Sequence, residues 1–463
     1  MQRIANLLFR SPFYPLGLFC LSVLFLLLGE ESFLAAFILF GNVIAAALFL
    51  SEDLEPCLFP FLCIMILGTV MLFSLERVLP ILPFGIPLVA GFVFHFIRYR
   101  KPFRPGRSFF GLLATSLAIL LGGLFTVSAE EYFNPVTLYY TLGLSLGLLF
   151  TYYVYATEYK VKRDYSPVSA LMTTLFYTGL LLCAVVVRFF LAHWQWFEGE
   201  SFGAMWEEFM YRNTVANLLI ICLPASFYLA GYRVKSPLLQ IILVLCGLSA
   251  FVCMILTSAR TAMLFGPVAF LLCLLLFLRG KSTLRIKWGS LLFLAITFAA
   301  LFLWKGDLIL DMLARKLVET GGMINPEEER MQLLFASFRD FLANPLFGVG
   351  LGSVRNAEIY SAAGCISWYH LYFPQIWGSM GLVGCAAFGY QLYQRVRLCL
   401  FRPSAESVAV MLSCLGLFLY SQTDPGEFIP VPFALLGVLL YVMLERHAEE
   451  QKGTLTVLSP IKK

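Results

Sequence analysis

Long apolar segments separated by short polar ones run along almost the whole chain of 463 residues. We count about 14 segments of about 17–25 residues, the length that an α-helix needs to cross a bilayer. Prolines weaken the third and fourth segments, so we expect about 12–14 membrane-spanning helices in one all-α bundle that covers residues 1–463. The expected spans centre on residues 13–29, 33–50, 57–75, 80–97, 109–127, 136–156, 167–190, 214–231, 237–256, 261–278, 288–304, 372–392, 405–421 and 428–444.

One long polar segment, residues 305–371, interrupts the second half of this pattern. Loops of this length are uncommon and are usually either functional or disordered. This one contains two helical patterns, a Gly-rich turn and several Arg residues, and it ends in His370. We therefore expect it to close over a site at the membrane surface, with the remaining helices as the frame.

The two helical patterns in the long loop differ in character. Residues 308–318 carry an apolar face and are suited to lie flat on the membrane. The second helix is expected to begin at Pro326, after Asn325 as N-cap, and to stop at Asn344-Pro345.

The second helix has an apolar stripe that should pack against the bundle. Arg330 borders this stripe, whereas Arg339 lies nine residues further on, about half a turn away around the helix. Arg330 is then the better placed of the two to face a central site. The stripe consists of Met331, Leu334, Phe335, Phe338, Phe341 and Leu342.

The composition supports a membrane protein and excludes an ordinary soluble domain. The chain is 60% hydrophobic and 13% charged, against roughly 25% charged residues in soluble domains. Nearly all of the 12 cysteines lie in apolar segments, and no C-x-x-C occurs, so we expect no disulfide framework. No metal site, other cofactor or nucleic-acid partner is expected.

The distribution of Lys and Arg predicts the topology. If the N-terminus is cytoplasmic, 23 of the 33 Lys and Arg residues fall in cytoplasmic segments and 10 in outer ones. Cytoplasmic loops of membrane proteins carry an excess of positive charge. We therefore expect a multi-pass protein of the cytoplasmic membrane with both termini cytoplasmic, and with residues 305–371 and the active face outside.

The few Arg residues on the outer side need a reason to be there. Arg212 and Arg260 each lie at the outer mouth of a span. Both are candidates for an anion clamp, and the alternative is an anchor that snorkels to the interface or pairs with Glu.

Other candidates lie in or near the outer loops. His370 is one of four histidines and stands where the long loop returns to the bilayer. It is either a structural residue or a base. An unperturbed histidine pKa of about 6.5 suits a base that takes a proton from a hydroxyl. Gly348 and Gly350 form either a flexible turn or a close approach to a sugar or phosphate. Arg355 and Trp194 are further candidate glycan contacts, although an aromatic belt also explains the Trp residues of its loop.

Four of these stretches together resemble the O-antigen ligase and polysaccharide polymerase superfamily, over residues 200–390. At two positions the sequence departs from the family: Leu371 replaces the usual Asn after the His, and Ser379 stands where Glu is frequent. The stretches are Arg212 with Asn213 through Pro224, Ser258-Ala259-Arg260, Arg330 with the turn at 344–352, and His370 through Gly384, which includes Gln375.

The resemblance implies an integral-membrane glycosyltransferase that works without a metal and takes its glycan from a polyprenyl diphosphate. It implies that Arg212, Arg260 and Arg330 hold the diphosphate, a task for which the planar, permanently charged guanidinium is suited. His370 would act as base on the acceptor hydroxyl, or would orient it. The partners would be the lipid-linked glycan donor, a glycan acceptor and membrane lipid.

Three interpretations remain open from the sequence. Within the transferase reading, a polymerase and a ligase differ only in the acceptor, and we favour polymerase or general polysaccharide assembly because Leu371 departs from the ligase pattern. A transporter or flippase for lipid-linked sugars is less favoured, because charged residues in mid-span are almost absent. A non-catalytic partner of a polysaccharide assembly complex is the third.

Overall fold

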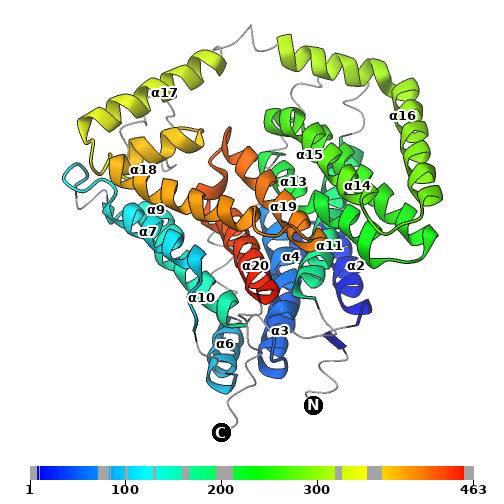
Figure 1. The fold of residues 1–463 in the computed structure, drawn as a ribbon, viewed down its shortest axis with the longest axis horizontal. Coiled ribbons are helices and arrows are strands. Elements are labelled where there is room, and N and C mark those ends of the chain that lie inside the picture. Colours follow the sequence, from blue (N-terminus) through cyan, green and yellow to red (C-terminus); the bar gives the residue numbers. More distant parts are fainter. Residues whose placement is uncertain are drawn as a thin grey trace.

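The computed structural model describes residues 8–9, 11–70, 83, 85–99, 103–128, 132–158, 166–193, 212–318, 326–351 and 368–452. Within these ranges the regular structure is entirely helical (Figure 1). The first half comprises α2 (Phe13–Leu28), η1 (Glu30–Ser32), α3 (Phe33–Leu50), α4 (Glu55–Val70), α6 (Ile86–Arg98), α7 (Arg107–Leu121), α9 (Pro135–Leu142), η3 (Gly143–Gly147), α10 (Leu148–Glu158) and α11 (Pro167–Ala192). The second comprises α13 (Arg212–Tyr228), η5 (Leu229–Arg233), α14 (Pro237–Leu256), α15 (Arg260–Leu278), α16 (Leu284–Val318), α17 (Pro326–Ala343), α18 (Tyr372–Cys399), α19 (Ala405–Ser421), η8 (Gly426–Phe428), η9 (Pro430–Ala434) and α20 (Leu435–Gln451).

All 14 segments that the hydropathy pattern predicts as spans contain a helix. Six helices of the described part are long and apolar enough to cross a membrane, and five shorter ones are also apolar. The prediction of an all-α, multi-pass membrane bundle is confirmed at this level.

The helix α13 forms the centre of the bundle. Its most apolar window is 94% buried, whereas that of α15 is only 39% buried. It packs against α11, α14, α15 and α19, as expected for a helix that is apolar all round. A second core lies between α7, η3, α10, α18 and α20.

Contacts between helix ends show that the chain runs up and down through the bundle. At one end, which we call the terminal end, Arg233 after α13 pairs with Glu406 at the start of α19. At the other end, the loop end, the Tyr420 hydroxyl at the end of α19 donates to the carbonyl of Asn213 at the start of α13. In Figure 1, α2 begins and α20 ends toward the lower edge, and α17 lies at the opposite edge.

The helices of the long loop differ in part from the prediction. The expected helix at 308–318 is not separate, because α16 continues through it as one helix of 35 residues. The C-terminal part of α16 nevertheless runs along the upper edge of Figure 1, across the direction of its first part. The second helix is confirmed, since α17 spans Pro326–Ala343 and stops before Asn344.

The apolar stripe of α17 does not pack against the bundle as predicted. Phe335 is 64% exposed and Leu342 is 72% exposed, whereas Leu333, Ser337 and Asp340 are buried against α18. Helices in lipid gain nothing by turning large apolar side chains inward, and they pack through small and polar residues instead. Much of the stripe therefore faces outward, whereas Leu333 and the small and polar side chains face the protein. Phe338 also lies against Trp377 of α18, with ring centres 5.0 Å apart.

The span predicted at 372–392 is broken. Gly381 has φ 60° and ψ −152° inside α18, and the helix changes direction there in Figure 1. The helical arm from Tyr372 to Met380 lies beneath α17, and the longer arm after the break packs along α7.

Candidate active site

Four side chains from three separate parts of the chain meet at the loop end. We call Arg212, His370, Tyr420 and Asp424 the mouth cluster. His370 Nδ1 lies 4.0 Å from Asp424 Oδ1, and the two side chains are 34% and 17% exposed. Asp424 stands in the turn that follows α19. An imidazole that faces a half-buried carboxylate is the arrangement of a general base with an orienting partner.

His370 is held firmly in place by its neighbours. The Tyr369 hydroxyl donates to Asp340 Oδ2 of α17 at 2.7 Å, and the Tyr369 amide donates to Gln375 Oε1 of α18 at 3.0 Å. His370 itself has φ 52°, a left-handed conformation that costs a non-glycine residue about 1–3 kcal/mol and is typical of functional sites. The imidazole is thus presented from a strained residue between two helices.

Tyr420 links Asp424 to the beginning of α13. Its hydroxyl lies 2.6 Å from the Asn213 carbonyl, to which it donates, and 3.5 Å from Asp424 Oδ2. Arg212 precedes Asn213 in the chain, so the first residue of α13 adjoins this hydrogen bond. One of the three predicted arginines is therefore in the neighbourhood of the His370–Asp424 pair.

Arg260 begins α15 beside the same turn. Thr261, the next residue, is hydrogen-bonded through its hydroxyl to Thr423, which precedes Asp424. Ser258 has φ 55°, and its buried hydroxyl has no hydrogen-bond partner among the described residues. The structure describes the helix position of Arg260 and not its side chain, and this position adjoins the turn of Asp424.

Arg330 lies in the second turn of α17, where again only the helix position is described. It stands seven residues, two turns, before Ser337, which places it near the helix face that packs on α18. Ser337 Oγ accepts a hydrogen bond from Trp377 Nε1 of α18 at 2.9 Å. Arg339 is 64% exposed, and the role of Arg330 at the site stays a prediction.

Gly348 and Gly350 adopt positive φ angles and join the long loop to the break in α18. Val349 N and Gly350 N donate to the carbonyls of Gly378 and Ser379 at 2.9 Å each. A Cβ on Gly348 would lie 2.4 Å from the Ser379 carbonyl carbon. The backbone of the turn closely approaches the protein's own α18 here, and the predicted approach to a sugar or phosphate stays a prediction.

The two departures from the family pattern lie in the short arm of α18 and just before it. Leu371 is the N-cap residue of α18. Ser379 is buried and accepts a hydrogen bond from Gln375 Nε2 at 2.9 Å. Ser379 therefore supports the segment that carries His370. The remaining predicted glycan contacts, Arg355 and Trp194, lie outside the described residues.

Asp424 and the Arg395–Glu427 ion pair are not among the residues predicted from the sequence. Arg395 is one of the 23 Lys and Arg residues assigned to cytoplasmic segments, but its side chain lies inside the bundle and pairs with Glu427 at 2.5 Å, with side-chain exposures of 11% and 8%. Both residues lie just outside the predicted spans 372–392 and 428–444, so the pair leaves untested the expectation that mid-span charge is nearly absent. In the sequence, Asp424 and Glu427 stand in the short acidic turn Asp424-Pro425-Gly426-Glu427 between two apolar segments. This turn could have indicated both residues, since ionisable residues within a membrane are usually functional.

Residues 242–389 match the family model described as O-antigen ligase. A search of the curated proteins returned no match. The matched range includes Arg260, Arg330 and His370, whereas Arg212 and Asp424 lie outside it and reach the same end of the bundle through the fold. The match supports a membrane protein with a general role in joining or polymerising glycans.

Proposed function

We propose, from the match of residues 242–389 to the family model described as O-antigen ligase, that this membrane protein is a glycosyltransferase of polysaccharide assembly. Its donor would be a glycan on a polyprenyl diphosphate, and its acceptor a sugar hydroxyl outside the cytoplasmic membrane. The observation that carries the proposal is the meeting of His370 and Asp424 beside Arg212 at one end of an apolar bundle.

The reaction would exchange one C–O bond for another at the anomeric carbon and would transfer one proton. The acceptor oxygen attacks the anomeric carbon of the donor sugar, and the bond between this carbon and the diphosphate oxygen breaks. The hydroxyl proton passes to His370, and the lipid diphosphate leaves with the bonding electron pair. With Nδ1 turned to Asp424, Nε2 is the nitrogen that would take the proton, and the carboxylate would stabilise the imidazolium that forms.

The arginines would act on the leaving group. Negative charge grows on the diphosphate as the bond breaks, and fixed cations aimed at developing charge are commonly the largest catalytic contribution. Arg212 of the mouth cluster begins α13 beside the Tyr420–Asn213 hydrogen bond, and Arg260 begins α15 beside the Thr261–Thr423 contact. Arg330 of α17 would be the third cation, over the short arm of α18.

Two observations keep a transporter of lipid-linked glycans as the second candidate. The helix α18 is broken at Gly381, and an ion pair lies inside the bundle. Discontinuous helices and buried charges are both frequent in transporters. A non-catalytic partner of an assembly complex would keep the same fold but would not need the His370–Asp424 pair.

An assay in detergent separates these candidates. Purified protein in micelles, incubated with a polyprenyl-diphosphate glycan and a glycan acceptor, is expected to yield a longer glycan and free polyprenyl diphosphate by mass spectrometry. A transporter has no compartments to act between in micelles and would leave the donor unchanged, as would a non-catalytic partner. Unchanged donor with every acceptor tried, in the presence of divalent cations as well as without them, would refute the proposed transfer.

The proposed sidedness has its own test. Lys281, at the terminal end, and Arg339, at the loop end, are both exposed. In intact spheroplasts, a membrane-impermeant maleimide is expected to label the Arg339→Cys variant and not Lys281→Cys, above the background of the parent protein. After lysis both should react. The reverse pattern in intact cells would place the mouth cluster on the cytoplasmic side.

A further inference from the structure

The Arg395–Glu427 pair differs from the other ion pairs between described residues because both of its side chains are nearly buried. Its side chains come from the long arm of α18 and from η8, and the guanidinium also lies 4.3 Å from the centre of the Tyr441 ring. Removing two charges from water is costly even when they pair, and such pairs add little net stability. Ionisable groups in the membrane interior usually serve function.

Glu427 belongs to the same tight turn as Asp424. The Glu427 amide donates to Ser421 Oγ at 3.0 Å, and the amides of Phe428 and Ile429 donate to the carbonyls of Pro425 and Gly426. Gly426 has φ 42°, and a Cβ there would lie 2.2 Å from Ser421 Oγ. Because the turn is short and crowded, a displacement of Glu427 would also displace Asp424.

The turn is also joined to the segment that carries His370. The Phe428 ring lies 5.5 Å from the ring of Tyr372 and 5.7 Å from that of Phe388, centre to centre. Tyr372 follows His370 by two residues. The turn therefore carries Asp424 and also packs against Tyr372, close to His370 in the chain.

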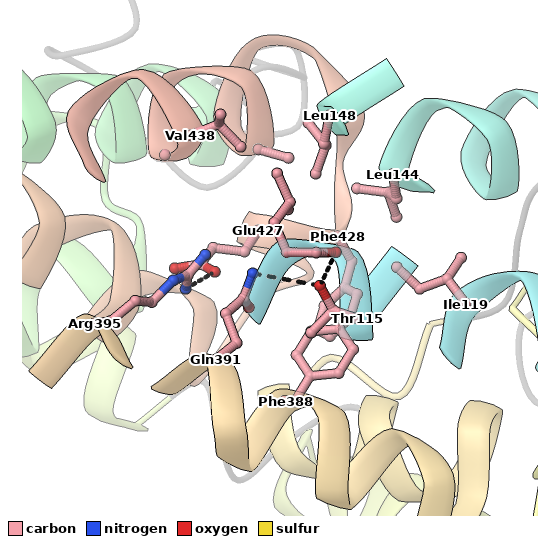
Figure 2. Close-up of a pocket in the computed structure, with 13 residues that line it drawn as sticks. Thr115, Ile119, Leu144, Leu148, Phe388, Gln391, Arg395, Glu427, Phe428 and Val438 are labelled. Carbon is pink, nitrogen blue, oxygen red and sulfur yellow. Dashed lines mark hydrogen bonds and ion pairs between the residues drawn. The ribbon is translucent and has the colours of Figure 1, made fainter. Parts of the chain in front are cut away.

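A cavity of about 30 Å³ adjoins the ion pair, and its mostly apolar wall also carries Thr115, Gln391, Arg395 and Glu427 (Figure 2). Glu427 Oε1 is buried and has no hydrogen-bond partner among the described residues. Across the cavity, Gln391 Nε2 donates to Thr115 Oγ1 at 3.4 Å. The space is enough for about one or two water molecules, which would satisfy the carboxylate oxygen that Arg395 leaves free.

We infer that Arg395 and Glu427 are positioning residues that hold Asp424 against His370 from inside the bundle. The inference rests on the proposed transfer function, since it assigns the pair a role in the same site. Arg395 fixes Glu427 to α18, Glu427 fixes the turn, and the turn sets the direction of the Asp424 carboxylate. Neither residue touches the reacting groups.

Kinetics of the purified protein test this role. Glu427→Gln is expected to lower kcat by about 10-fold or more, because an uncompensated Arg395 would pull the turn away, and to change the donor KM less than about 2-fold. The double variant Arg395→Met, Glu427→Leu removes both charges, so it should fold well and still transfer slowly. Glu406→Gln, which breaks the more exposed Arg233–Glu406 pair at the terminal end, is the matched control and should keep kcat.

A second readout is independent of transfer. In a His370→Cys, Asp424→Cys background, a short bifunctional thiol reagent should link the two positions, and peptide mass spectrometry measures the rate. Adding Glu427→Gln is expected to lower this rate several-fold. An unchanged rate, or wild-type kcat in the double variant, would overturn the positioning role. A slower rate in a protein that transfers no glycan would support the positioning role and refute the proposed function alone.

Discussion

Replacing His370 by Ala is expected to reduce the kcat of glycan transfer by about 10²–10⁴-fold, the usual contribution of a positioned general base. Donor binding should stay close to wild-type, because the proposed diphosphate contacts are arginines on other helices. The measurement is single-turnover transfer by reconstituted protein at saturating donor, with binding of the polyprenyl diphosphate measured separately.

Two further variants make the result specific. His370→Asn keeps a residue that tolerates positive φ but lacks a basic nitrogen, so it should lose as much activity as Ala while folding normally. Asp424→Asn should lower kcat by up to about 5-fold, since it removes one partner of a partly exposed ion pair worth about 0.2–1 kcal/mol. His447→Gln, at the terminal end, is the control. Wild-type transfer by His370→Asn would remove the histidine from the reaction.

Hydropathy and helix signals predicted most of the fold, because these signals are local. An apolar run of sufficient length must satisfy its backbone internally and become a helix, so each of the 14 predicted spans contains one. Pro326 and the Asn344-Pro345 pair set the ends of α17 for equally local reasons.

The parts that could not be predicted depend on contacts between distant segments. The break at Gly381 arises where the turn of Pro345 and Leu346 reaches α18: the amides of Leu382 and Val383 donate to these two carbonyls. The outward stripe of α17 depends on whether water or lipid surrounds the helix, which its period alone does not reveal.

The candidate site was predicted where a charged residue stood at an apolar boundary, as His370 and Arg212 do. Asp424 was missed because its role requires the end of α19 to meet the start of α18, about 50 residues earlier in the chain. Glu427 and Arg395 were missed for the same reason. Each looks like an ordinary end of a span until the bundle brings the two together.

The second large effect is expected on stability, where the Gly-rich turn at Gly348 and Gly350 packs against α18. Gly348→Ala should destabilise the protein by about 3–4 kcal/mol. The left-handed backbone alone costs an alanine about 1–2 kcal/mol, and displacement of the turn would lose the hydrogen bonds of Val349 N and Gly350 N, each worth about 1 kcal/mol. A new Cβ at 2.4 Å from the Ser379 carbonyl carbon meets backbone on α18, which cannot swing aside as a flexible side chain can.

Thermal unfolding in detergent, followed by tryptophan fluorescence and by size-exclusion chromatography, measures this effect. Gly389→Ala is the matched control in the same helix α18, because a Cβ there meets nothing within 4 Å and alanine favours a helix over glycine by about 1 kcal/mol. It should unfold at the wild-type temperature or above. Because the turn braces the segment that begins at His370, any Gly348→Ala protein that folds should also transfer glycan slowly. Wild-type stability and transfer in Gly348→Ala would mean that the long loop does not need this contact to hold the site together.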